Sequence, residues 1–137
     1  TINVGDSRLY RYRSGCLSQL SRDQSLVQLL FEEGTITKEE KQNHKHRNII
    51  FPVLGNLSST PDFDIRSTDE CVQFGDLLLL CSDGLSDYVS TNEIEEILAL
   101  PKPLVRRLRL LTDLALENGS QDNITIIALM RMAENDR

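Results

Sequence analysis

The strongest constraint on the fold of this chain is an apolar run, Leu77 to Cys81, followed by Ser82-Asp83-Gly84. The run has the length of a buried β-strand, and turn residues bound it on both sides. Because Asp83 lies just past the end of the run, we expect its carboxylate at the end of a rigid strand, where Gly84 lets the chain turn away. A carboxylate held in this way suits a metal or acid–base site, and an ordinary Ser-Asp-Gly turn is the alternative interpretation.

Composition narrows the class of protein. The 137 residues suit one domain or part of one, and 39% are hydrophobic, which is enough for a packed core. The net charge of -6 argues against nucleic-acid binding and favours a cation or a basic partner. The three cysteines include no Cys-x-x-Cys pair, which predicts free thiols and a cytoplasmic location. Since no apolar run is long enough to span a bilayer and nothing resembles a signal peptide, we expect no membrane segment.

Strand patterns occur at both ends of the chain. The segments 1–4, 9–13 and 16–20 read as strands joined by turns, which predicts an antiparallel meander. Asp6 lies in the first turn, so we expect its side chain at one end of the sheet, with a self-bonded turn aspartate as the alternative. The β-branched run 124–130 predicts a further strand, in the centre of a sheet, and Asp122 shortly precedes it.

Helix signals lie between these strands. We expect a helix that begins after Ser25 and ends at Gly34, and short helices that begin with capping boxes at Thr37 and Ser90. The longest helix is expected from 104 to 118, with Arg106, Arg107 and Arg109 on a solvated face. The predicted apolar stripes are Leu26, Leu29 and Leu30 on the first helix and Ile94, Ile97 and Leu98 on the helix after Ser90. On the longest helix the predicted buried stripe is Leu104, Leu108, Leu111 and Ala115.

Residues 43–48 form a basic, hydrophilic segment in an otherwise acidic chain. His44 and His46 are two positions apart, which would place both on one face of a strand and allow a metal pair. A histidine also titrates near neutral pH and could donate a proton. A solvated loop is the alternative interpretation of the same residues.

The aspartates near the strand ends suggest a shared site. If the strands next to Asp83 and Asp122 are antiparallel neighbours, both carboxylates fall on one rim of the sheet. Two carboxylates ~5 Å apart repel by about 3 kcal/mol at an effective dielectric constant of about 20, and a bound cation would offset this repulsion. All-oxygen ligands suit Mg²⁺ or Mn²⁺, and paired ions of this kind activate water and clamp phosphoryl oxygens. The residues alone leave open whether the rim is shared.

Several segments, in order along the chain, resemble motifs of the metal-dependent serine/threonine protein phosphatases of type 2C, the PPM family. The resemblance extends from Thr1 to about Met130, and it rests on the order of the motifs because each motif alone is weak. The segments are Asn3-Val4-Gly5-Asp6-Ser7-Arg8, Asp23-Gln24-Ser25-Leu26-Val27 (with Gln24 in place of the usual His), a flap-like stretch 34–44, the stretch 48–55, Leu79 to Asp87, and Gly119 to Ile126.

The resemblance implies a fold and a domain organisation. The expected class is α+β, part of a four-layer α-β-β-α sandwich of two antiparallel sheets flanked by helices. Residues 1–131 would be the C-terminal portion of the catalytic domain of a bacterial-like member, with a flap at about 24–55. Residues 132–137 would be a frayed tail.

The resemblance also implies roles for individual residues. Asp83 and Asp122 would bind a dinuclear Mg²⁺ or Mn²⁺ centre, and Asp6 and Asp87 would join Asp83 in a third, weaker metal site. His44 would be the catalytic candidate in the flap, beside the active site. The implied reaction is attack of a metal-bridging water on phosphoserine or phosphothreonine, in phosphorylated proteins or protein kinases that act in signalling.

The sequence departs from the family pattern in its length and at several positions. The family's N-terminal half, which supplies a phosphate-binding Arg and a metal-bridging Asp, has no counterpart before Thr1, so we expect the chain alone to be inactive and to need that half as a partner. Lys45 and Phe51-Pro52 replace a Pro and a Thr-Arg pair. A non-catalytic phosphatase-like binding or regulatory module is the alternative, and a Ca²⁺/Mg²⁺-binding structural domain has less support because no EF-hand-like loop is present.

Overall fold

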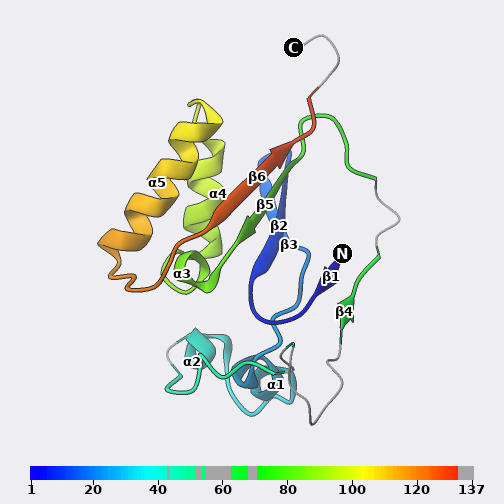
Figure 1. Ribbon diagram of the computed structural model, residues 1–137, viewed down its shortest axis with the longest axis vertical. Coiled ribbons are helices and arrows are strands. Elements are labelled where there is room, and N and C mark those ends of the chain that lie inside the picture. Colours follow the sequence, from blue (N-terminus) through cyan, green and yellow to red (C-terminus); the bar gives the residue numbers. More distant parts are fainter. Residues whose placement is uncertain (43, 52–53, 55–62, 68–70, 133–137) are drawn as a thin grey trace. The chain divides into compact units, whose positions relative to one another are not determined.

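The computed structural model describes residues 1–42, 44–51, 54, 63–67 and 71–132 (Figure 1). The chain divides into two compact units, one of Thr1–Ser7 with Ser21–Arg66 and the other of Arg8–Leu20 with Ser67–Arg137. Each unit contains one antiparallel sheet together with helices. The expected α+β class with two antiparallel sheets is therefore confirmed.

The larger sheet lies in the second unit, and its strand order is β3-β2-β5-β6. The strands are β2 (Arg8–Arg13), β3 (Cys16–Gln19), β5 (Leu77–Cys81) and β6 (Ile126–Met130). The helices of this unit are α3 (Asp83–Ser86), α4 (Thr91–Ala99) and α5 (Leu104–Glu117). Strand β5 has the bounds expected from its apolar run, and it pairs antiparallel with β2 on one side and β6 on the other.

One face of this sheet packs against the helices. Alternation along β5 buries Leu77, Leu79 and Cys81 in the core and turns Leu78 and Leu80 to the other face, where Leu80 is 40% exposed. The helices contribute Leu85, Ile94, Leu98, Leu111 and Ala115 to the same core, and Val89 joins it from the turn between α3 and α4, next to Tyr10 of β2. The stripes predicted for α4 and α5 are therefore confirmed, and so is the capping box at Ser90.

Strand β6 is an edge strand among the described residues, so its predicted central position is wrong. Ile127 and Leu129 are 53% and 58% exposed, on the face away from the helices. Apolar and β-branched residues indicate that a segment forms a strand and packs its side chains. They do not indicate whether a neighbouring strand lies on one side of it or on both. At the opposite edge, the Glu95 carboxylate accepts the backbone N–H of Leu17 at 2.6 Å and covers part of β3.

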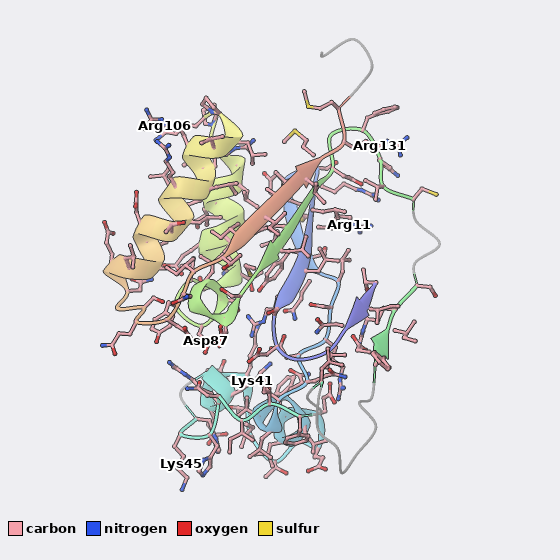
Figure 2. All side chains as sticks on the ribbon, in the orientation of Figure 1. Arg11, Lys41, Lys45, Asp87, Arg106 and Arg131 are labelled. Atoms are coloured by element: carbon pink, nitrogen blue, oxygen red, sulfur yellow. The ribbon has the colours of Figure 1, made fainter. Side chains whose placement is uncertain are left out.

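One of the three arginines predicted on the solvated face of α5 has a structural contact instead. Arg106 and Arg109 are exposed, and Figure 2 shows Arg106 pointing away from the helix. Arg107 is partly buried and donates from Nη1 to the carbonyl of Leu98 at 2.5 Å, near the end of α4. A cation at a helix C-terminus is favourable because the last carbonyls lack helical partners.

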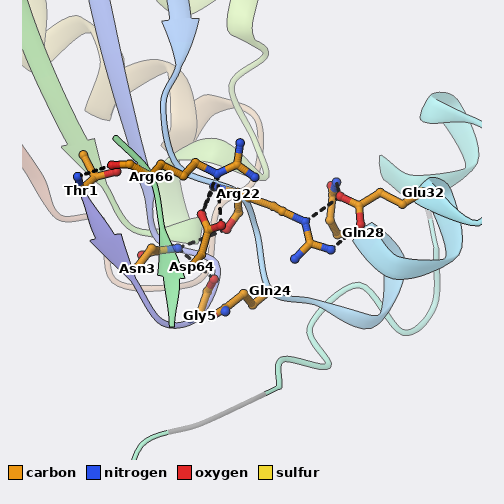
Figure 3. Close-up of polar contacts among 9 residues, drawn as sticks. All are labelled: Thr1, Asn3, Gly5, Arg22, Gln24, Gln28, Glu32, Asp64 and Arg66. Carbon is orange, nitrogen blue, oxygen red and sulfur yellow. Dashed lines mark hydrogen bonds and ion pairs between the residues drawn. The ribbon is translucent and has the colours of Figure 1, made fainter. Parts of the chain in front are cut away.

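The first unit contains β1 (Ile2–Asn3), β4 (Asp64–Ile65), α1 (Leu26–Glu32) and α2 (Lys38–Gln42). Strand β1 pairs with β4, so the predicted meander is correct only for β2 and β3. Backbone bonds between Thr1 and Arg66 extend this pairing, and Asp64 accepts the backbone N–H of Arg22 (Figure 3). These contacts are made by residues distant in sequence, which local strand patterns do not reveal.

Helix α1 begins and ends as expected, but it buries a different side chain. Ser25 accepts the N–H of Gln28 as the N-cap, and Gly34 follows the helix with φ of 73°. Val27 is buried, Leu26 and Leu30 are partly buried, and Leu29 is 38% exposed, so the predicted stripe is wrong at Leu29. The backbone N–H of Leu26 donates to the Ile49 carbonyl at 2.9 Å and ties the first residue of the helix to a segment distant in sequence. The capping box at Thr37 is confirmed by reciprocal bonds with Glu40 at the start of α2.

Asp76 makes the second unit sensitive to acid. Its carboxylate is buried and accepts two bonds from Arg13, each of 2.7 Å, and one from the Gln73 N–H at 2.7 Å. The Arg13 guanidinium lowers the pKa of Asp76 from 3.8 to about 2. A carboxyl group with a lowered folded-state pKa stabilises the fold above its unfolded pKa, and that stability is lost as the pH falls through the folded pKa.

We therefore expect the urea concentration at the unfolding midpoint to decrease as the pH is lowered from 3.8 to about 2. The decrease should be less steep in Asp76→Asn. Urea unfolding followed by circular dichroism across this range measures the difference. Asp113→Asn, which changes an exposed acid on α5, should keep the wild-type slope. Equal slopes for Asp76→Asn and the wild-type chain would contradict the assignment.

Candidate functional site

The ends of β5 and β6 meet at the same end of the larger sheet. Cys81, the last residue of β5, pairs with Ile126, the first residue of β6. Asp83 lies two residues after the end of β5, and Asp122 lies in the loop that leads into β6. The condition for a shared rim, antiparallel neighbouring strands, is therefore met. We call Asp83, Asp87 and Asp122 the acidic rim.

The serine before Asp83 joins the two segments of the acidic rim. The N–H of Ser82 donates to the Thr125 carbonyl at 3.1 Å, and its hydroxyl donates to the Asn123 carbonyl at 3.0 Å. The same hydroxyl accepts the N–H of Thr125 at 3.0 Å. The sequence alone indicates only a turn at Ser82. It does not reveal these bonds, because the partners are more than forty positions away along the chain. These bonds hold the two acidic segments in a fixed relation.

Gly84 is needed for a different reason from the one expected. It lies inside α3 and its φ is not among the positive values, so it does not serve as a turn glycine. A Cβ at this position would come within 2.4 Å of the Asn123 carbonyl oxygen. The Ser120 hydroxyl also donates to the Gly84 carbonyl at 2.8 Å. Only glycine allows the loop before β6 to approach α3 so closely.

Each of the two predicted principal ligands accepts a bond from the backbone N–H of the next residue. Asp83 is partly buried and accepts the N–H of Gly84 at 2.9 Å through Oδ1. Asp122 is exposed and accepts the N–H of Asn123 at 2.7 Å through Oδ1. An ionised carboxylate has about four acceptor sites. One such bond therefore leaves capacity for a metal ion at each group.

Asp87 lies on the same side of α3 as Asp83. It is the C-terminal cap of this helix, and its N–H donates to the Asp83 carbonyl at 2.9 Å. Residues four positions apart lie one helical turn apart on the same face. Figure 2 shows Asp87 at the end of the sheet where α3 begins. The structure therefore brings Asp83, Asp87 and Asp122 to one region of the second unit.

Asp6 and His44 belong to the first unit. Asp6 is partly buried in the turn after β1, as predicted, although the sheet it follows is β1–β4. His44 lies in a turn closed by the bond from the Arg47 N–H to the His44 carbonyl, at 3.1 Å. Its Nδ1 accepts the N–H of His46 at 3.2 Å. The strand required for the predicted histidine metal pair is therefore absent from this segment, although the two rings lie 5.6 Å apart.

The predicted flap, at about 24–55, includes residues 43, 52, 53 and 55, which lie outside the described residues. The frayed tail predicted at 132–137 lies outside them from residue 133 onwards. Where the structure describes the chain, no helix has both the length and the hydrophobicity needed to cross a bilayer.

The acidic rim fits part of a site for a hard divalent cation. Its donors are all carboxylate oxygens, which suit Mg²⁺ and Mn²⁺. Among the described residues, no group of three or more His, Cys, Asp and Glu side chains is arranged to hold a metal ion. A complete coordination sphere at the rim therefore needs further oxygen ligands, from water or from other parts of the protein.

The chain is similar in sequence to bacterial phosphatases, although no family model matches it. The serine/threonine protein phosphatase PstP of Mycobacterium tuberculosis is 40% identical over 126 residues, which cover 92% of this chain and 24% of PstP. The serine/threonine phosphatase Stp of Listeria monocytogenes is 38% identical over 129 residues, which cover 94% of this chain and 50% of Stp. The chain thus spans half or less of the length of these two relatives.

Solved structures agree with the sequence comparison. The crystal structure of the M. tuberculosis phosphatase PstP/Ppp has a TM-score of 0.82 at 38% identity, over 96% of this chain and 54% of that one. The catalytic domain of PstP in complex with two manganese ions has a TM-score of 0.76 at 37% identity, over 95% and 52%. The chain is therefore homologous, over about half of the solved domain, to the bacterial serine/threonine protein phosphatases of the PPM family.

Proposed function

We propose that this chain is the C-terminal portion of a phosphatase domain, and that the intact domain hydrolyses phosphoserine and phosphothreonine in proteins with Mg²⁺ or Mn²⁺. The observation that carries this proposal is the acidic rim, where Ser82 and Gly84 hold Asp83 close to the loop of Asp122. The similarity to named serine/threonine phosphatases supports the reaction, and the manganese complex of PstP supports the metal.

In this proposal Asp83 and Asp122 bind the two metal ions of the site. Bound ions of this kind lower the pKa of a coordinated water and neutralise charge on the phosphoryl group. The chain's own contribution is to fix the two carboxylates: Ser82 bridges their segments, and Gly84 permits close approach. A ligand set held in this way needs little rearrangement when the metal binds.

The sequence motifs extend the assignment to three further residues. On these motifs we propose that Asp6 and Asp87 are further, weaker metal ligands, and that His44 lies in a flap that affects access of the substrate. These roles rest on the motifs. Mutation of each residue in an active domain, with metal affinity and activity measured separately, distinguishes ligands from access residues.

The remaining ligands would come from the half of the domain that this chain does not cover. The solved PstP/Ppp chain is covered to 54%, so nearly half of that domain has no counterpart here. The exposed apolar side chains of Ile127 and Leu129, on the face of the sheet away from the helices, fit burial against a further layer of the domain. We also propose phosphorylated proteins or protein kinases as substrates, and a cytoplasmic location, which the free thiols of Cys16, Cys71 and Cys81 support.

A chimeric protein tests this function. The chain would replace the matching segment of the Listeria phosphatase, to which it is 38% identical over 129 residues. We expect Mn²⁺-dependent release of phosphate from a phosphothreonine peptide by the chimera, and none by the chain alone. A folded chimera without activity would contradict the proposal and support a non-catalytic binding module, which the incomplete ligand set of the described residues also fits.

A further inference from the structure

Gln24 is a buried polar residue that contacts the residue next to Asp6. Its side chain is 6% exposed. Its Oε1 accepts the N–H of Gly5 at 2.9 Å, and its backbone N–H donates to the Gly5 carbonyl at 2.9 Å. Figure 3 shows Gln24 beside Gly5. The two residues therefore form a reciprocal pair of hydrogen bonds.

This pair holds the peptide unit that leads into Asp6. The carbonyl of Gly5 belongs to the Gly5–Asp6 peptide, so bonds to this oxygen set the direction of the backbone at Asp6. Asn3 donates a second bond to the same oxygen at 3.2 Å. Gly5 has φ of 108°, in the left-handed region where other residues are strained, so the turn depends on outside contacts to keep its shape.

Gln24 is itself held by the start of α1. Its carbonyl accepts the N–H of Phe51 at 3.1 Å, and Leu26 donates to Ile49 at 2.9 Å. The neighbouring acid, Asp23, has a different partner, Lys41, at 3.3 Å. A buried amide is costly unless it forms hydrogen bonds. The bonds to Gly5 account for the presence of a polar side chain at this buried position.

We infer that Gln24 is a positioning residue, which holds the Gly5–Asp6 turn so that the Asp6 carboxylate is oriented to bind a divalent cation. The inference rests on the proposed role of Asp6 as a metal ligand. Supporting hydrogen bonds of this kind typically change metal affinity by about 10–100-fold. The same position carries His in the phosphatase motif that this segment resembles, and a neutral imidazole nitrogen can also accept an N–H.

The test uses the 137-residue chain, with backbone amide signals assigned by NMR. In Gln24→Leu, we expect the Gly5 amide to exchange with solvent about 10-fold faster, because its acceptor is lost. Titration with Mn²⁺ alone broadens signals near the bound ion, and half-broadening at Asp6 should need about 10-fold more Mn²⁺ than in the wild-type chain. Ser25→Ala, which removes the adjacent helix cap, should lower stability without changing the Mn²⁺ response of Asp6.

A second variant separates positioning from general damage to the fold. Gln24→His should restore the wild-type Mn²⁺ response at about pH 8 and lose it at about pH 5.5, because an imidazolium donates at both nitrogens and cannot accept the Gly5 N–H. The wild-type chain and Gln24→Leu should not show this pH contrast in the Mn²⁺ response of Asp6. A purely structural effect would weaken the Mn²⁺ response of Gln24→His equally at both pH values.

Two results would overturn the inference. The first is an unchanged Gly5 exchange rate and Mn²⁺ response in Gln24→Leu. The second is Mn²⁺ broadening in the wild-type chain at Asp83 and Asp122 without broadening at Asp6, which removes Asp6 as a ligand and leaves the proposed function intact. Absence of broadening at all three residues, both in the chain and in the folded chimera, would instead contradict the proposed metal site itself, together with the inference that depends on it.

Discussion

Asn in place of Asp83 lowers kcat/KM of the active chimera by about 100-fold or more, because a neutral amide cannot replace the charge that holds the cation. The amide oxygen of Asn can still accept the N–H of Gly84, the bond that orients Asp83 at 2.9 Å. The fold should therefore persist while the metal site fails. Steady-state hydrolysis of a phosphothreonine peptide, measured over a range of Mn²⁺ concentrations, gives the loss.

Asp122→Asn should produce a loss of similar size, and the double variant should lose little more than either single variant. Groups that hold the same metal centre act as a unit, so their effects do not add. Asp113→Asn is the matched control, because it removes an exposed acid of the same unit from the outer surface of α5. If Asp83→Asn retains more than about a tenth of the kcat/KM of the unmutated chimera, Asp83 is not a metal ligand.

Gly84→Ala should destabilise the second unit by about 3 kcal/mol or more, at the upper end of what an added methyl group costs in a packed site. The new Cβ would meet the Asn123 carbonyl oxygen at 2.4 Å, and backbone atoms cannot move aside as a flexible side chain can. Relief of the contact requires α3 to separate from the loop before β6. That separation would also break the bond from Ser82 to Asn123 and disrupt the acidic rim.

Gly75→Ala provides the comparison for this substitution. Gly75 has φ of 84°, and a Cβ added to it would meet no atom within 4 Å. Alanine at this position therefore adds backbone strain alone, about 1–2 kcal/mol. Urea unfolding of both variants measures the difference in the free energy of unfolding. If Gly84→Ala is no less stable than Gly75→Ala, close approach is not the reason for glycine at position 84.

Local signals in the sequence predicted most of the secondary structure. The apolar run between turn residues predicted β5 with its observed bounds, and Ser25, Thr37 and Ser90 marked the starts of helices correctly. These signals work because a cap or a run of alternating burial satisfies backbone and side-chain requirements within a few residues. The stripe predicted for α1 was wrong at Leu29 because the buried face of a short helix depends on the segments it packs against, and Ile49, which bonds to Leu26, is distant in sequence.

By itself, the sequence determined the identity of the strands and caps, the position of Asp83 after β5, and the acidic character that points to a cation. Only the tertiary structure decided which strands pair, and hence that β1 joins β4 and that β6 lies at an edge of the described sheet. It also assigned roles to Ser82, Gly84 and Gln24 through contacts with Thr125, Asn123 and Gly5. The physical reason is that these contacts join segments far apart along the chain, and residue preferences describe only the local part of a residue's surroundings.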